Sequence, residues 1–201
     1  MLTNDTRPVN LERRQHLLSV ARQVFAERGF TATTMDDVAR AAGFTKPILY
    51  QYFDSKTDLY REIVAQTAAR LLSQLETAVE TTTSPRERIE VAFRVYFETV
   101  VSEPDAFRIL FIHAHEGETA NELRNLELGL VSFIEPYITV EISDDHRRQL
   151  AAGVVGIAEG TALAWLVQSR DEPGAHVEEA ARLAARAATL AWGGLRAVTQ
   201  D

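Results

Sequence analysis

The sequence predicts an all-α protein with about nine helices, in which a small N-terminal domain precedes a larger helical body. Apolar residues recur at spacings of three and four through nearly all of the 201 residues, as they do along the buried face of a helix. Glycine, proline and Ser or Thr mark the breaks, where they favour helix ends and starts. A hydrophobic content of 46% over this length is enough to bury a substantial core.

The N-terminal residues predict a first helix and a short second one. The first helix begins near Asn10 and ends at Gly29, a typical residue to follow a helix end. Thr34 then begins the second helix, with Asp37 at the spacing of a capping box. Gly43 ends this helix after about two turns and allows a tight turn.

A third helix is predicted from Thr45 to Phe53, with Pro47 in its first turn, where proline is tolerated. Leu49 and Phe53 are four residues apart and share its inner face. Two short helices joined by a glycine turn describe a helix-turn-helix. A packed helical hairpin, whose tyrosines cover the neighbouring helix, is the alternative. In either case the outer side of the third helix carries Lys46, Pro47, Tyr50 and Gln51.

The body is predicted to hold six further helices, and the boundary between the two domains is expected at 56/57. The head would then be residues 1–56 and the body 57–201. Capping signals, prolines and polar turns place the helices as follows: from Ser55 to about Glu80, from Pro85, over 105–116, over 119–136, and over roughly 144–169 and 174–197.

Charge and composition exclude several classes of function. Residues 1–56 carry eight Lys and Arg against six Asp and Glu, whereas the remainder carries 13 against 23, so a mildly basic head precedes an acidic body. The chain has no cysteine, which excludes disulfides and thiolate chemistry. With no leader-like or membrane-spanning run, we expect a cytoplasmic protein without membrane contact.

No catalytic or cofactor motif stands out, so we expect no enzyme, no cofactor and no metal. There is no glycine-rich phosphate loop and no G-x-S-x-G motif. His113 and His115 are two residues apart and point to different sides of a helix, which makes them a poor metal pair; His113 and Glu116 are better spaced. A pocket-lining or satisfied histidine is the simpler interpretation.

The run TTMDDVARAAGFTKPILYQYFDSKTDLY resembles the DNA-binding head of the TetR family of bacterial transcriptional repressors. The resemblance covers about residues 10–62 and does not reach the body. It implies a homodimer, double-stranded operator DNA as partner, a recognition helix over 45–53 and a divergent C-terminal domain that binds a small-molecule effector.

The resemblance also implies roles for single residues of the head. Thr34 and the Tyr52 hydroxyl would donate to backbone phosphates, and Lys56 would add a charge at the start of the fourth helix. Base edges in the major groove would be met from the recognition helix. The residues that meet the bases would be Lys46, Pro47 and Tyr50, and Thr45 is a further expected DNA contact. Many members of the family have a small residue where Pro47 stands.

Stripes of small residues in the last two helices indicate close helix packing. Each glycine inside a helix costs about 0.5–1 kcal/mol relative to alanine, so a stripe of them needs a compensating contact. The resemblance implies that both helices pair with their copies in a second subunit. Packing within one chain is the alternative. The residues expected at the dimer interface are Ala152, Gly156, Gly160, Ala184 and Ala188.

Aromatic residues of the body are candidates for an effector pocket, since ligand pockets are lined largely by such side chains. The candidates are Phe93, Phe97, Phe111, His115, Phe133 and Trp165, with Tyr137 and Glu159 as further polar groups. For any single ring, simple filling of the core is the alternative, and Glu159 could equally lie at an interface. The expected effector is apolar or amphipathic.

We therefore expect a ligand-responsive repressor that binds a palindromic operator as a homodimer. An activator or silencing factor with the same head is one alternative, because the sign of regulation depends on where the operator lies. The other is a helical ligand-binding protein or enzyme that no longer binds DNA.

Overall fold

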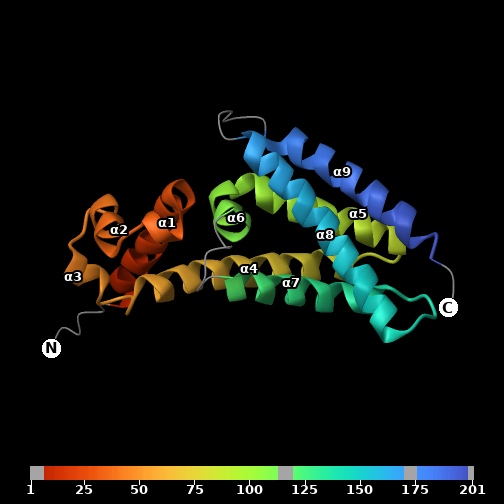
Figure 1. The fold of residues 1–201 in the computed structure, drawn as a ribbon, viewed down its shortest axis with the longest axis horizontal. Coiled ribbons are helices and arrows are strands. Elements are labelled where there is room, and N and C mark those ends of the chain that lie inside the picture. Colours follow the sequence, from red (N-terminus) through yellow and green to blue (C-terminus); the bar gives the residue numbers. More distant parts are fainter. Residues whose placement is uncertain (1–6, 113–119, 170–175, 199–201) are drawn as a thin grey trace.

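A computed structural model describes residues 7–112, 120–169 and 176–198 of the chain. Over these ranges the secondary structure is helical, with no β-strand, which confirms the predicted all-α fold. The helices are α1 (Arg7–Ala32), α2 (Met35–Ala41), α3 (Lys46–Leu49), α4 (Lys56–Glu80), α5 (Pro85–Ser102), α6 (Pro104–Phe111), α7 (Ala120–Ile134), the 3-10 helix η2 (Glu135–Tyr137), α8 (Asp144–Gln168) and α9 (His176–Leu195) (Figure 1).

The head is built from α1, α2 and α3, at one end of the molecule (Figure 1). Gly29 interrupts α1 with a φ of 78°, and Gly43 forms the turn between α2 and α3 with a φ of 73°. Both lie in the left-handed region that favours glycine, as the sequence predicted for two helix ends. Leu49 and Phe53 are buried, which fixes the rotation of α3 on the head.

The third helix is shorter than predicted, because its regular part ends at Leu49. The backbone N–H of Gln51 donates to Ile48 and that of Tyr52 donates to Leu49, each at 3.1 Å. These are bonds between residues three apart, so the chain tightens into a turn after Leu49. The N–H of Phe53 still reaches Leu49 at 3.1 Å, and its ring thereby stays on the inner face.

Helix α4 joins the head to the body as one continuous helix (Figure 1). Its residue Tyr60 is fully buried and stands edge-on to the rings of Phe25 and Phe30 in α1, with centroids 5.5 and 5.1 Å away. The Tyr60 hydroxyl donates to the backbone carbonyl of Ile109 in α6 at 3.1 Å. One side chain of α4 therefore contacts both the head and the body.

Ion pairs add a second connection between the head and the body. Glu103, at the junction of α5 and α6, accepts from Arg22 of α1 at 2.9 Å and from Arg70 of α4. Arg14 of α1 forms a two-pronged pair with Glu62 of α4, and this contact raises the pKa of Arg14. The position of the head on the body is thus held by α4 and α6 together.

The body surrounds α5 and the C-terminal half of α4 with four other helices. α9 packs along α5 more extensively than any other helix pair packs, and α7 lies along α4. α8 crosses between these layers, from the end of α7 toward α6 (Figure 1). Aromatic rings from α5 and α6 fill the centre, where Tyr96 and Phe107 meet edge-on at 5.9 Å.

Candidate nucleic-acid interface and effector cavity

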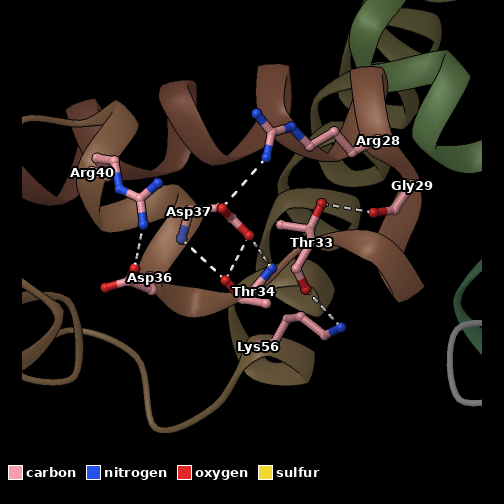
Figure 2. A network of polar contacts seen from close by, with 8 residues as sticks. All are labelled: Arg28, Gly29, Thr33, Thr34, Asp36, Asp37, Arg40 and Lys56. Atoms are coloured by element: carbon pink, nitrogen blue, oxygen red, sulfur yellow. Dashed lines mark hydrogen bonds and ion pairs between the residues drawn. The ribbon is translucent and has the colours of Figure 1, made fainter.

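The start of α2 is held by the predicted capping box (Figure 2). The Thr34 hydroxyl accepts from the backbone N–H of Asp37 at 3.2 Å and donates to its carboxylate at 2.6 Å, while the Thr34 N–H donates to the same carboxylate at 3.0 Å. These hydrogen bonds from Thr34 are the main reason why the pKa of Asp37 is lowered. The hydroxyl that was predicted to donate to a phosphate is therefore engaged with Asp37 in this structure.

The outer side of α3 carries the predicted base-contacting residues. Lys46, Pro47 and Tyr50 are exposed, and the Lys46 ammonium lies 6.0 Å from the centre of the Tyr50 ring. Thr45 precedes the helix as its N-cap residue, and its exposed side chain makes no capping hydrogen bond. Four exposed side chains on or directly beside this short helix are thus available to a partner molecule.

The two remaining predicted DNA contacts are less exposed. Tyr52 is half-buried and packs against the core of the head. The Lys56 ammonium donates to the backbone carbonyls of Phe30 and Thr33 at 2.7 and 2.9 Å, and lies 4.2 Å from the centre of the Phe30 ring (Figure 2 shows the bond to Thr33). Lys56 therefore binds the end of α1 to the start of α4, a contact that the sequence pattern did not indicate.

An apolar cavity of about 280 Å³ lies in the body between the C-terminal parts of α4, α7 and α9, the N-terminal parts of α5 and α8, and the segment after η2. Two predicted pocket residues, Phe93 and Phe133, line it, together with Tyr137. Phe97 and Phe111 are buried in the core, and Trp165 is packed against that core; none of the three reaches the cavity. His115 lies outside the described residues, as do His113 and Glu116.

The sequence analysis did not predict two arginines that line the cavity. Arg88 and Arg196 both line it, and Arg88 places its guanidinium 4.8 Å from the centre of the Tyr137 ring while donating to the Thr82 carbonyl at 3.0 Å. The spacing of Pro85, Arg88 and Ile89 along one helix face was the available signal. The cavity is therefore amphipathic, because two cationic side chains lie beside an apolar wall.

Glu159 is a half-buried carboxyl near a second buried polar group. Burial, and then the nearby charge of Glu127, raise the pKa of Glu159 to about 7. Burial, and then the charge of Glu159, raise the pKa of the Tyr96 hydroxyl. Near neutral pH, Glu159 is therefore protonated in the folded chain far more often than an ordinary glutamate would be.

This pKa predicts a pH dependence of stability that a Glu159→Gln variant should lose. Between about pH 4.5, where an ordinary glutamate titrates, and about pH 7, the folded chain keeps a proton that the unfolded chain releases. Stability therefore falls as the pH rises through this window. Because the side chain is partly solvated, we expect Glu159→Gln to gain only about 1 kcal/mol more at pH 8 than at pH 5. Urea unfolding at pH 5 and pH 8 measures the free energy of unfolding of both proteins. An equal difference between variant and wild type at the two pH values would contradict the prediction.

The small residues predicted for the dimer interface divide into two groups. Ala152, Gly156 and Gly160 of α8 are exposed, and an added Cβ at either glycine would meet no neighbouring atom within 4 Å in the described part of the chain. Ala184 and Ala188 of α9 are instead buried inside the chain, at 4% and 3% exposure. Because α9 packs against α5, these two alanines are unavailable to a second subunit.

The surface of α8 is unusually apolar for an exposed helix. Among the described residues it is the one helix long and apolar enough to cross a bilayer, with a mean hydropathy of 1.7, yet only 28% of that window is buried. Two large apolar side chains of α8 are exposed, Leu163 (39%) and Val167 (58%). Val177 (81%) and Leu190 (65%) are exposed on α9.

A helix-turn-helix head, carried by a long helix that continues into a helical body with an apolar cavity, defines a DNA-binding transcriptional regulator. Residues 17–63 match the profile described as bacterial regulatory proteins, tetR family. The transcriptional activator FasR of Mycolicibacterium smegmatis is 31% identical over 189 residues, which are 92% of this chain and 83% of that protein. The chain belongs to the TetR family of bacterial transcriptional regulators.

Solved structures agree with the fold along almost the whole chain. A TetR-like regulator from Rhodococcus sp. RHA1 is 26% identical, with a TM-score of 0.73 over 92% of this chain and 97% of that one. The regulator FadR from Bacillus subtilis, solved in complex with stearoyl-CoA, is 14% identical, with a TM-score of 0.75 over 90% of this chain and 98% of that one.

Proposed function

We propose that the protein is a ligand-responsive repressor that binds a palindromic operator as a homodimer and is released by a small amphipathic molecule. The head would be residues 1–56 and the body 57–201. One observation carries the DNA-binding part: Lys46, Pro47 and Tyr50 are exposed together on α3, whereas Leu49 and Phe53 anchor its other side. A helix fixed in this rotation can enter a major groove with those three side chains toward the bases.

The exposed apolar surface of α8 supports the homodimer. A contiguous apolar surface of this kind usually marks an interaction site, and glycine along it lets two helices approach closely. A second copy of α8 offers the same small residues in return. Two heads held by such an interface would reach half-sites about 34–36 Å apart, or a multiple of that, which explains why the operator is proposed to be palindromic.

The lining of the cavity supports an effector with an apolar chain and an anionic end. The wall is formed almost entirely by apolar side chains, and Arg88 and Arg196 are its cationic members. A guanidinium beside an apolar wall suits a carboxylate or phosphate joined to a hydrocarbon chain. Stearoyl-CoA, bound by the B. subtilis FadR, has both parts. We accordingly propose fatty acids or their thioesters as the effector class.

The connections between body and head suggest how the effector would act. It lowers DNA affinity only if it binds better to a conformation whose heads are wrongly spaced. A coupling of about 1–3 kcal/mol would change operator affinity by about 5–150-fold. Movement of α4 would pass to the head through Tyr60, and movement of α6 through Glu103, because both side chains contact head and body elements.

Lys46→Ala and Tyr50→Ala are expected to weaken binding to an operator selected from random duplexes. Each loses contacts to base edges, at about 1–3 kcal/mol, or about 5–150-fold in affinity. Binding to a scrambled duplex should change far less. Fluorescence anisotropy at fixed salt measures the affinity for each duplex. Arg86→Ala, which changes an exposed side chain of α5, is the control. Unchanged operator affinity in both α3 variants would remove this helix from the interface.

A reporter promoter separates the proposed repressor from the alternatives. Repression of the reporter that is lifted by a fatty acid supports the proposal. Activation from the same operator would show that the protein is an activator rather than a repressor. If no duplex is selected at all, the protein is a helical ligand-binding protein or enzyme rather than a DNA-binding regulator.

A further inference from the structure

The inner end of the cavity is lined by apolar residues and by Tyr96, and two carboxyl groups belong to residues next to that lining. Tyr96 is the last residue of α5 that lines it, Ala158 the last of α8, and Leu130 the first of α7. Glu159 follows Val155 of the wall by four residues, so it lies one turn further along the same side of α8. Glu127 precedes Leu130 by three residues and is placed likewise on α7. The charge of Glu127 acts on Glu159 and that of Glu159 acts on Tyr96, so these polar groups lie near one another beside the inner end of the cavity.

Two buried polar atoms at this inner end lack a hydrogen-bond partner among the described residues. They are the hydroxyl oxygen of Tyr96 and one carboxyl oxygen of Glu159. Tyr96 is only 4% exposed, and its ring is fixed edge-on against Phe97 and Phe107, at 5.2 and 5.9 Å. A buried polar atom without a partner is costly, so native proteins rarely keep one without a use for it.

The charges around these atoms restrict what they can bind. Glu127 and Glu159 act on each other as like charges, and Glu159 acts in the same sense on the Tyr96 hydroxyl. An anionic group would add to this repulsion. A neutral hydroxyl suits the pair better, because it can accept from the tyrosine and donate to the carboxyl group.

We propose that the effector carries a hydroxyl group at the far end of its apolar chain, and that Tyr96 and Glu159 bind this hydroxyl at the inner end of the cavity. The inference rests on the proposed effector class, whose anionic end would lie at Arg88 and Arg196. The bound hydroxyl would join α5 to α8 directly beside Phe107 of α6. Because α6 contacts α1 of the head, this end of the cavity is the one closest to the DNA-binding residues.

Calorimetric titration with straight-chain fatty acids of 8 to 16 carbons, each paired with its ω-hydroxy counterpart, tests the proposal. At the chain length that spans the cavity, we expect the ω-hydroxy acid to bind wild-type protein about 3- to 10-fold more tightly, as one additional buried hydrogen-bonding group allows. Tyr96→Phe and Glu159→Met should bind both acids equally. Tyr137→Phe, which changes a tyrosine near Arg88, should keep the preference.

The outcomes separate this inference from the effector class on which it rests. If no acid of either kind binds, both the proposed effector class and the proposed hydroxyl site are contradicted. If the plain acids bind and the ω-hydroxyl brings no gain at any length, or if the gain persists in Tyr96→Phe and Glu159→Met, only the hydroxyl site is overturned. Loss of the preference in Tyr137→Phe would also overturn it.

A melting experiment without ligand provides an independent check. Tyr96→Phe should melt no lower than the wild type, because it removes a buried hydroxyl that has no hydrogen-bond partner among the residues that the structure describes. A clearly lower melting temperature would show that this hydroxyl has a structural partner, and would overturn the proposal.

Discussion

A Gly160→Leu variant is expected to be a folded monomer that no longer binds operator DNA tightly. The glycine is exposed, and a Cβ added there meets no neighbouring atom of the described residues within 4 Å, so this part of the fold has room for the new side chain. In a symmetric dimer the leucine would be present twice at the closest approach of the two α8 helices. Each overpacked side chain costs about 1–3 kcal/mol, so the affinity of the two subunits for each other should fall by about 30- to 10⁴-fold.

Sedimentation at a series of concentrations measures this loss, and circular dichroism checks the fold. Ala69→Leu, at an exposed position of α4, adds a leucine to the surface outside the α8 stripe and serves as the control. Operator affinity should fall together with dimerisation, because one head alone contacts only a half-site. A Gly160→Leu protein that stays dimeric at the wild-type concentration would place the interface elsewhere.

The sequence could predict those parts of the site that depend on residues close together in the chain. Local signals were sufficient in the head: Thr34 and Asp37 form the capping box that their spacing indicated, and Leu49 and Phe53 lie on one buried face. These features depend on residues three or four apart, whose relative position a helix fixes. They do not depend on how distant helices cross.

The cavity could not be predicted in this way. Phe93 and Phe97 are four residues apart, and their rings stack at 6.2 Å, yet only Phe93 lines the cavity. Periodicity shows that a side chain faces inward, but not which neighbouring helix or void it meets. The same limit applies to α9, where Ala184 is buried against α5 and Ala185 faces outward. An alanine stripe alone does not tell an intrachain contact from an interface.

Lys56 shows that a residue implied by resemblance can have a second role that only the structure reveals. Two of its three ammonium donors are engaged with backbone carbonyls at the end of α1, at 2.7 and 2.9 Å (Figure 2 shows Thr33, one of the two partners). The chain there has passed Gly29 and turns toward α2, and the Phe30 carbonyl also accepts from the Thr33 N–H at 3.4 Å. Lys56 thereby fixes the start of α4 to the segment that leads into the helix-turn-helix.

We therefore expect Lys56→Met to lower the free energy of unfolding by about 1.5–3 kcal/mol, as loss of a hydrogen-bonded charged group does. Methionine keeps an apolar stem above the Phe30 ring, so the loss reports on the ammonium. Affinity should fall for every duplex alike, because the position of the whole head changes, while the slope of affinity against salt stays the same. Urea unfolding and anisotropy at several salt concentrations measure the two effects.

Arg40→Met is the matched control, since Arg40 is an exposed cation of α2 whose guanidinium pairs with Asp36 (Figure 2). It should leave the free energy of unfolding nearly unchanged, as removal of an exposed ion pair does. If Lys56→Met instead keeps full stability and reduces the salt slope by about one unit, Lys56 acts as a phosphate contact rather than as a support. If Lys56→Met lowers both the stability and the slope of affinity against salt, Lys56 is both a support and a phosphate contact. Its third donor would then reach the DNA while the other two hold α1.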